Sequence, residues 1–280
     1  MAGSALTGEA VDLAALVGLF SGLAVRAAVE IAEVASEGIA VSSKPDQSPV
    51  TDADRRAEEV ILAGLEEHFG AVPVVAEEEV AAGRLPDISG GRFFLVDPLD
   101  GTKEFVSRRT DYTVNIALVD DGVPVAGVVC APARRAIWRG YCSEAGAIAQ
   151  KAELDETLEP GAWRPIGCRS SAGPPVIVAS RSHLTEETAA FITRFPESEC
   201  VSIGSSLKFC LLAEGQADVY PRFGPTMEWD TAAGDAVLRA AGGTTRTLDG
   251  APLTYGRRNA ERPFLNPHFI ATSHEQFVIT

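Results

Sequence analysis

Apolar residues recur at helical spacing in two segments near the start of the chain. Residues 13–34 predict one helix, and residues 51–69 predict a second. Thr51, with Asp54 three residues later, fits a capping box at the start of the second helix. Between the two helices, residues 38–49 predict a polar loop rich in Ser and Pro. One face of the second helix is apolar and consists of Ala57, Val60, Ile61, Leu65 and Phe69.

Shorter apolar runs after residue 70 have the length and pattern of strands. Residues 72–76 and 93–96 predict two strands. Residues 112–119 alternate apolar and polar side chains, turn at an Asp-Asp-Gly sequence and return through residues 123–130, which predicts a hairpin. Residues 136–141 and 147–150 continue this meander. The first half of the chain is therefore predicted to be helices followed by mostly antiparallel strands.

The pattern changes after a polar stretch, residues 153–174, which contains several Pro and Gly residues. We interpret this stretch as a junction between an α+β domain, residues 1–155, and a smaller α/β domain, residues 156–280. Beyond the junction, strands at 176–179, 200–203 and 217–220 alternate with helices at 186–194, 206–214 and 230–241. Two glycines, Gly242 and Gly243, end the last helix.

The composition of the 280 residues is that of an ordinary globular protein, with 46% hydrophobic and 22% charged residues. The net charge of −15 disfavours nonspecific binding to nucleic acid or to an anionic membrane. An anionic substrate would therefore require local positive charge in its site, such as a bound cation. The apolar run at residues 16–25 is shorter than a membrane span and follows acidic residues, so we expect no stable membrane insertion and no secretory signal.

The five cysteines are scattered, odd in number and free of any CxxC pair. This usage argues against a disulfide framework or a zinc site and favours the cytoplasm.

The sharpest chemical feature is the sequence Asp-Pro-Leu-Asp-Gly-Thr at residues 97–102, directly after a predicted strand. Asp97 and Asp100 are predicted to lie on a rigid turn that directs both carboxylates to one point, and hard cations such as Mg²⁺ prefer such oxygen ligands. A solvated acidic turn is the alternative. An acidic triplet, Glu77 to Glu79, follows another predicted strand, where a solvated loop is again the alternative.

A further acidic residue, Asp230, lies at the start of the last predicted helix, where a role as the N-cap is the alternative. Together, Glu77, Asp97, Asp100 and Asp230 would form a four-carboxylate cluster drawn from both halves of the chain. The mutual repulsion of these carboxylates would require cations.

The chain resembles the inositol monophosphatase superfamily of metal-dependent phosphatases over residues 10–270. Lys103-Glu104-Phe105 and the stretch Ser-Leu-Lys-Phe-Cys resemble its bacterial 3′(2′),5′-bisphosphate nucleotidases more than its inositol phosphatases. The matching stretches are SPVTDAD at 48–54, AEE at 76–78, LVDPLDGTKEF at 95–105, YTVNIAL at 112–118, SRSH at 180–183, SIGSSLKFC at 202–210 and YPRFGPTMEWDTAAG at 220–234.

The resemblance implies a set of ligands for two Mg²⁺ ions, or three. Glu77, Asp97 and the Leu99 carbonyl would hold one ion. Asp97, Asp100 and Asp230 would hold a second.

The resemblance also implies catalytic and substrate-binding roles. Glu77 and Thr102 would orient the attacking water, and Asp54 would support that water or a further metal. The residues implied to contact substrate are Glu77, Leu99, Asp100, Gly101, Thr102, His183, Ser205, Lys208, Arg222 and Asp230. Gly101 and Thr102 would offer backbone N–H groups to a phosphate at a helix start. Lys44 would guard the metal site or remain solvated.

The implied fold is a layered αβαβα sandwich. The implied reaction removes the 3′-phosphate of adenosine 3′,5′-bisphosphate to give AMP, with the sulfated relative as a further substrate and Li⁺ as an inhibitor. The partner would be a small-molecule nucleotide. An inositol or sugar-phosphate monophosphatase, or a noncatalytic phosphate-binding scaffold, remains an alternative. Monomer or homodimer, and loose association with the inner membrane, also stay open.

Overall fold

The computed structural model describes residues 11–43, 49–170, 173–180, 185–258 and 261–274. Its helices are α1 (Leu13–Glu37), α2 (Asp52–Phe69), α3 (Glu77–Ala81), α4 (Thr102–Val106), α5 (Glu186–Ile192), α6 (Leu207–Ala213), α7 (Glu228–Ala240) and the 3-10 helix η1 (Pro132–Arg134). Its strands are β1 (Val41–Ser43), β2 (Pro49–Thr51), β3 (Val74–Ala76), β4 (Arg92–Asp100), β5 (Thr113–Asp120), β6 (Val123–Ala131), β7 (Ala136–Ser143), β8 (Gly146–Glu153), β9 (Arg164–Pro165), β10 (Val176–Ser180), β11 (Glu199–Ile203), β12 (Val219–Arg222), β13 (Thr244–Thr247) and β14 (Phe269–Thr272).

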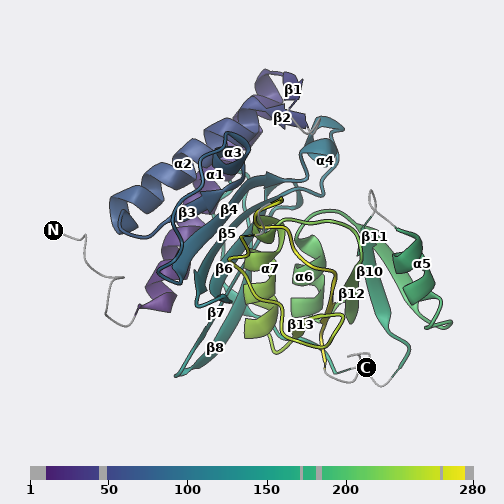
Figure 1. Cartoon of the computed structure of the whole chain (residues 1–280). Helices are drawn as coiled ribbons and strands as arrows, with labels where there is room; N and C mark the ends of the chain where they lie inside the picture. The colour runs from purple at the N-terminus through teal and green to yellow at the C-terminus, as the bar shows by residue number, and fades with distance from the viewer. Residues whose placement is uncertain (1–10, 44–48, 171–172, 181–184, 259–260, 275–280) are drawn as a thin grey trace.

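These elements stack in five layers (Figure 1). Helices α1 and α2 cover one face of a seven-stranded sheet, whose strand order is β3-β4-β5-β6-β7-β8-β9. Helices α6 and α7 lie between that sheet and a five-stranded sheet of order β11-β10-β12-β14-β13, and α5 lies outside the second sheet. The predicted αβαβα sandwich is therefore confirmed.

The first sheet is antiparallel except for the parallel pair β3 and β4. In the second sheet, β10 pairs in parallel with both β11 and β12, while β14 pairs antiparallel with β12 and β13. The carboxyl ends of β10, β11 and β12 therefore meet at one edge of the sheet, where polar loops can converge on a site.

Helix α1 is the longest in the described chain, with 25 residues. One face of it, including Phe20 and Ile31, is fully buried against α2 and the first sheet. Among the described helices it is the one that is long and apolar enough to cross a membrane, which the expectation based on residues 16–25 did not foresee. Mostly buried core helices of soluble proteins and signal sequences have the same length and composition.

Helix α7 packs closely against the first sheet at two glycines that lie opposite each other on β6 and β7. Gly127 and Gly140 are paired in the sheet register. A Cβ atom added to Gly127 would lie 2.6 Å from the Ala233 carbonyl oxygen, and one added to Gly140 would lie 2.8 Å from the Val237 Cα atom. The missing side chains therefore set the position of the helix that carries Asp230.

The predicted helices and the hairpin at residues 112–130 are confirmed, with their ends shifted by a few residues. The polar loop predicted at 38–49 is wrong in part, because residues 41–43 within it pair antiparallel with residues 49–51 as strands β1 and β2. Strands β13 and β14 were not predicted. The domain boundary at 155/156 stays a prediction, and β9, at residues 164–165, still pairs with the first sheet.

Candidate functional site

The Asp-Pro-Leu-Asp segment is the end of strand β4 and not the turn that its sequence predicts. Asp97 pairs with Asn115 and Asp100 pairs with Thr113, with a shift of register between the two pairs. Pro98 has no N–H to donate to the ladder, which explains why the pairing is interrupted at this point. The Asp97 side chain is completely buried and accepts a hydrogen bond from the Leu99 amide at 3.0 Å.

Asp54 combines the capping role and the contact to the site that were considered as alternatives for it. One carboxylate oxygen accepts bonds from the amide and the hydroxyl of Thr51, both at 2.7 Å. The other accepts from the Thr102 hydroxyl at 2.9 Å, which also contacts the Leu99 carbonyl at 3.2 Å. Asp54 is fully buried, so these bonds fix α2 to the turn that follows β4.

Asp100 joins the two sheets through the loop between β11 and α6. Its Oδ2 atom accepts hydrogen bonds from the Ser205 hydroxyl and from the Ser206 amide, each at 2.8 Å. Ser205 has φ of 57°, a left-handed conformation that costs a non-glycine residue about 1 kcal/mol or more. The bonds to Asp100 and to the Thr113 hydroxyl offset that strain.

Three of the predicted carboxylates line one cavity of about 290 Å³ between the sheets. Glu77 begins α3, Asp100 ends β4, and Asp230 lies in the first turn of α7. Burial, together with the negative charges of Asp100 and Glu77, raises the pKa of Asp230 well above its ordinary value. Asp230 is not the N-cap of α7; it lies three residues after Met227 and accepts a bond from the Met227 amide at 2.8 Å.

The donor set suits a hard cation, because carboxylate and carbonyl oxygens are the ligands of Mg²⁺ and repel each other without one. Among the residues that the structure describes, no group of three or more His, Cys, Asp or Glu side chains could hold a metal ion as it stands. Asp54, Asp100 and Asp230 instead accept hydrogen bonds from neighbouring hydroxyl or amide groups. The chemistry of the residues therefore fits a metal, while side-chain rotation would have to complete the ligand shell.

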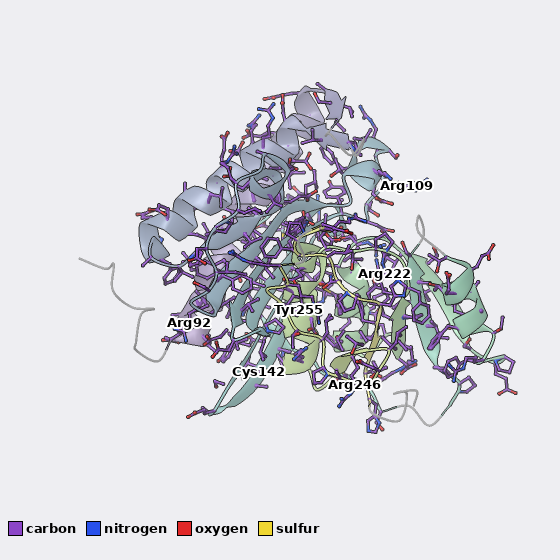
Figure 2. The ribbon with its side chains drawn as sticks, in the orientation of Figure 1. Arg92, Arg109, Cys142, Arg222, Arg246 and Tyr255 are labelled. Atoms are coloured by element: carbon purple, nitrogen blue, oxygen red, sulfur yellow. The ribbon has the colours of Figure 1, made fainter. Side chains whose placement is uncertain are left out.

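The same cavity is also lined by cationic side chains. Lys208 on α6 and Arg222 at the end of β12 both line it, and both are less than one-tenth exposed (Figure 2 labels Arg222). The Lys208 ammonium donates to the Ser205 carbonyl, and burial lowers its pKa to about 8, against the opposing effect of Asp100. Arg222 donates to the carbonyls of Gly224 and Pro225 at 3.1 and 2.6 Å.

The structure gives little or no support to three of the predicted contacts. Gly101 is the N-cap of α4 with φ of 96°, but α4 has only five residues, so it supplies little helix dipole for a phosphate. His183 and Lys44 lie outside the described residues.

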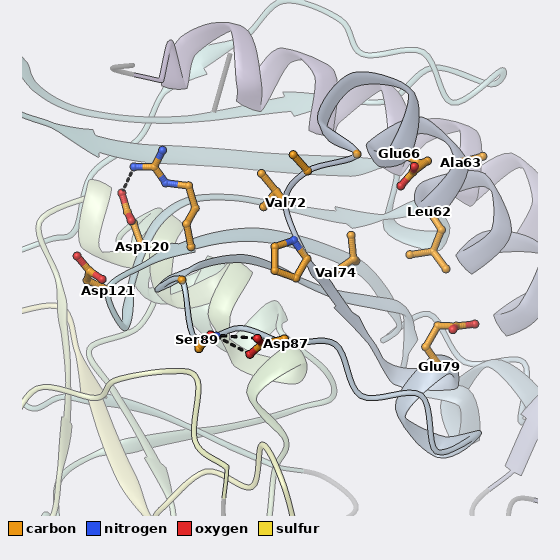
Figure 3. Close-up of a pocket in the computed structure, with 15 residues that line it drawn as sticks. Leu62, Ala63, Glu66, Val72, Val74, Glu79, Asp87, Ser89, Asp120 and Asp121 are labelled. Atoms are coloured by element: carbon orange, nitrogen blue, oxygen red, sulfur yellow. Dashed lines mark hydrogen bonds and ion pairs between the residues drawn. The ribbon is translucent and has the colours of Figure 1, made fainter. Parts of the chain in front are cut away.

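A larger cavity, about 1,030 Å³, lies elsewhere, beside β3 and the end of α2 (Figure 3). Five carboxylates line it, and its one guanidinium, that of Arg92, pairs with Asp120 at 2.6 Å. These carboxylates would repel an anionic ligand. The charges of the lining residues therefore favour the smaller cavity as the site of an anionic substrate, although the other cavity has the larger volume. The five carboxylates are Glu66, Glu79, Asp87, Asp120 and Asp121.

Sequence reasoning missed the residues that hold the Ser205–Ser206 loop. The Asn115 amide donates to the Ser206 hydroxyl at 3.1 Å, and Thr113 contacts Ser205. Thr113 and Asn115 occupy alternate positions at the start of β5, which is otherwise apolar as far as Asp120 at its end. That alternation was the available signal.

Comparisons with known proteins show which family the chain is similar to. The model of the inositol monophosphatase family matches residues 12–276. The chain is 47% identical over 229 residues to the 3′(2′),5′-bisphosphate nucleotidase CysQ of Escherichia coli (strain K12), covering 82% of this chain and 87% of that protein. The crystal structure of CysQ from Bacteroides thetaiotaomicron superimposes with a TM-score of 0.75 at 37% identity, covering 91% of this chain and 97% of that one.

An inositol monophosphatase from Anabaena shares the fold, with a TM-score of 0.70 at 23% identity over 94% of this chain and 92% of that one. Family model, sequence relatives and fold agree over nearly the whole length. The chain therefore belongs to the inositol monophosphatase family.

Proposed function

We propose that the protein is a magnesium-dependent phosphatase that hydrolyses the 3′-phosphate of adenosine 3′,5′-bisphosphate to AMP and phosphate. The observation that carries this proposal is a single cavity lined by three carboxylates, here called its acidic wall, and by two buried cations, here called its cationic wall. The acidic wall is Glu77, Asp100 and Asp230, and the cationic wall is Lys208 and Arg222. The bisphosphate nucleotidases of E. coli and Haemophilus influenzae, 47% and 31% identical to this chain, support the nucleotide as substrate.

The acidic wall, together with Asp97 and the Leu99 carbonyl, would hold two Mg²⁺ ions, or three. Magnesium bound there supplies positive charge and Lewis acidity that offset the charge of the phosphate. Burial, together with Asp100 and Glu77, raises the pKa of Asp230 because the ionised carboxylate is unfavourable there. A bound cation would stabilise that ionised form.

The Thr102 hydroxyl is placed to orient a water molecule. It has one proton, which it directs to the buried Asp54 carboxylate at 2.9 Å. Its lone pairs are then available to accept a hydrogen bond from water, with Glu77 lining the same cavity. Asp54 therefore acts through Thr102, and both residues position the water for attack on the phosphate.

The cationic wall would bind the second phosphate and the nucleoside. Lys208 supplies a charged donor, since an anionic ligand restores the protonated form that burial disfavours. Arg222 is buried and held by two carbonyls, so its guanidinium is oriented before substrate arrives. His183 and Ser205 complete the proposed contacts.

Phosphate release with Mg²⁺ tests the proposal. We expect much faster turnover of adenosine 3′,5′-bisphosphate than of inositol 1-phosphate, and no turnover by an Asp97→Asn variant that folds like the wild type. A clear preference for the inositol ester would support the inositol phosphatase alternative. Absence of Mg²⁺-dependent release from any small phosphate ester would favour the noncatalytic scaffold.

We also propose inhibition by Li⁺, a small-molecule nucleotide as the partner, and a location in the cytoplasm. Lys208 and Arg222 in the cavity support the nucleotide, because they supply local positive charge in an acidic protein. The odd number of scattered cysteines supports the cytoplasm.

A further inference from the structure

A buried carboxylate outside the cavity connects the two halves of the site. Asp111 lies between α4 and β5 and is 1% exposed. It accepts bonds from Arg134, at the end of η1, through Nε at 3.1 Å and Nη2 at 2.5 Å. Its other oxygen accepts from the Gly204 amide at 3.2 Å, across 93 residues of sequence.

The backbone of Asp111 also packs against two glycines of the site. A Cβ atom added to Gly101 would lie 2.9 Å from the Asp111 carbonyl oxygen, and one added to Gly204 would lie 3.1 Å from the same atom. Gly101 directly follows Asp100, and Gly204 directly precedes Ser205. Asp111 is therefore wedged between the two turns whose neighbouring residues form the Asp100–Ser205 hydrogen bond.

We propose that Asp111, held by Arg134, is a positioning residue that clamps the Gly204 turn against the Gly101 turn. The clamp places the Ser205 hydroxyl and the Ser206 amide so that they fix the Asp100 carboxylate at the mouth of the cavity. This inference rests on the proposed function, in which Asp100 ligates magnesium.

The energetics favour a positioning role for this pair. The Arg134 side chain is 38% exposed, so solvent screens its attraction to Asp111 and the ion pair itself contributes modestly. The Asp111 carboxylate is buried, so removing its charge or its donors leaves polar groups unsatisfied at the Gly204 turn. The strained φ of Ser205 makes that turn dependent on such contacts.

A second buried pair offers a matched control. Asp218 is fully buried, accepts from Arg169 Nη2 at 2.5 Å and accepts a backbone bond from the Val176 amide at 2.7 Å. It lies at the start of β10 and β12, whereas the cavity lies at their opposite ends, where Ser180 and Arg222 line it. Asp218→Asn therefore removes the charge of a buried, arginine-paired carboxylate, as Asp111→Asn does, but at a distance from the site.

The experiment compares wild type, Asp111→Asn and Asp218→Asn in two measurements on the full chain. Hydrogen–deuterium exchange without metal reports the amides of residues 204–206, and calorimetric titration reports the Mg²⁺ dissociation constant. For Asp111→Asn we expect faster exchange at residues 204–206 and a dissociation constant raised about tenfold, the lower end of the effect of removing an outer-shell partner. For Asp218→Asn we expect neither change.

Unchanged Mg²⁺ affinity in folded Asp111→Asn would overturn the inference, as would equal losses in both variants. If Asp111→Asn fails to fold, Arg134→Lys replaces it, because lysine keeps the charge but loses the paired donors. The same two changes are then expected in smaller degree, and their absence overturns the inference. If wild type binds no Mg²⁺, the proposed function fails, and exchange at residues 204–206 still decides whether the clamp exists.

Discussion

Substituting Gly127 by Ala tests how tightly the position of Asp230 depends on the first sheet. The added methyl group would lie 2.6 Å from the Ala233 carbonyl oxygen, 2.9 Å from the Ala233 Cα atom and 2.9 Å from the Ala236 Cβ atom. Two of these atoms are helix backbone, so no side-chain rotation relieves the clash. An ordinary contact begins at 3.4 Å, which requires α7 to move by about 0.8 Å.

The cost of such overpacking is about 1–3 kcal/mol of unfolding free energy. Since Ala233 is one helical turn from Asp230, the same movement displaces that carboxylate, and a misplacement of about 1 Å can cost roughly a hundredfold in rate. We therefore expect Gly127→Ala to lower both the free energy of unfolding, measured in urea, and Mg²⁺-dependent turnover.

Gly18 provides the control, because it lies on the exposed side of α1 and a Cβ atom there meets no other atom within 4 Å. Gly18→Ala should raise the free energy of unfolding by about 0.5–1 kcal/mol and leave turnover unchanged. If Gly127→Ala kept wild-type stability and turnover, the close packing would not position Asp230.

Three further predictions concern single side chains. Burial raises the pKa of Glu58 to about 8, so the folded protein keeps a proton that the unfolded chain releases above pH 4.5. The free energy of unfolding of the metal-free protein should therefore fall from pH 5 to 8, and Glu58→Gln should abolish much of that fall; a flat wild-type profile would contradict this. Thr102→Ala should lower turnover by roughly a hundredfold while calorimetry shows Mg²⁺ binding kept, and loss of binding would refute its role. Lys208→Ala should raise KM for the bisphosphate nucleotide by roughly 10- to 100-fold and spare a small phosphate ester, whereas equal losses would argue against its place at the distal phosphate.

The helices and the central hairpin were predictable because their signals are local. The apolar face of α2 and its capping box at Thr51 and Asp54 are contained within 19 residues, and the structure places both as predicted. Strands β13 and β14 carry no comparable pattern. They form because β14 pairs with β12, about 50 residues earlier in the chain, and such pairing cannot be inferred from short windows.

In the candidate site, too, some residues were predictable from the sequence and others were not. The acidic residues were identifiable because carboxylates directly after apolar strands need a partner, and Glu77, Asp100 and Asp230 do line one cavity. The groups that hold them were not identifiable. Ser206 donates to Asp100 across 106 residues, so only the folded chain shows the contact.

The predicted turn at residues 97–100 was wrong for a related reason. Pro98 is a turn signal locally, but β5 pairs with both sides of it and retains the segment as strand.

Crystals grown with Mn²⁺ in place of Mg²⁺, measured for anomalous scattering, would test the central claim most directly. The account predicts anomalous density in the cavity, contacted by Glu77, Asp97, Asp100 and Asp230. Asp100 should keep the bonds that its Oδ2 atom accepts from Ser205 and Ser206 and contact the ion through its other oxygen. Density only at the surface, with these four side chains directed to separate places, would contradict it.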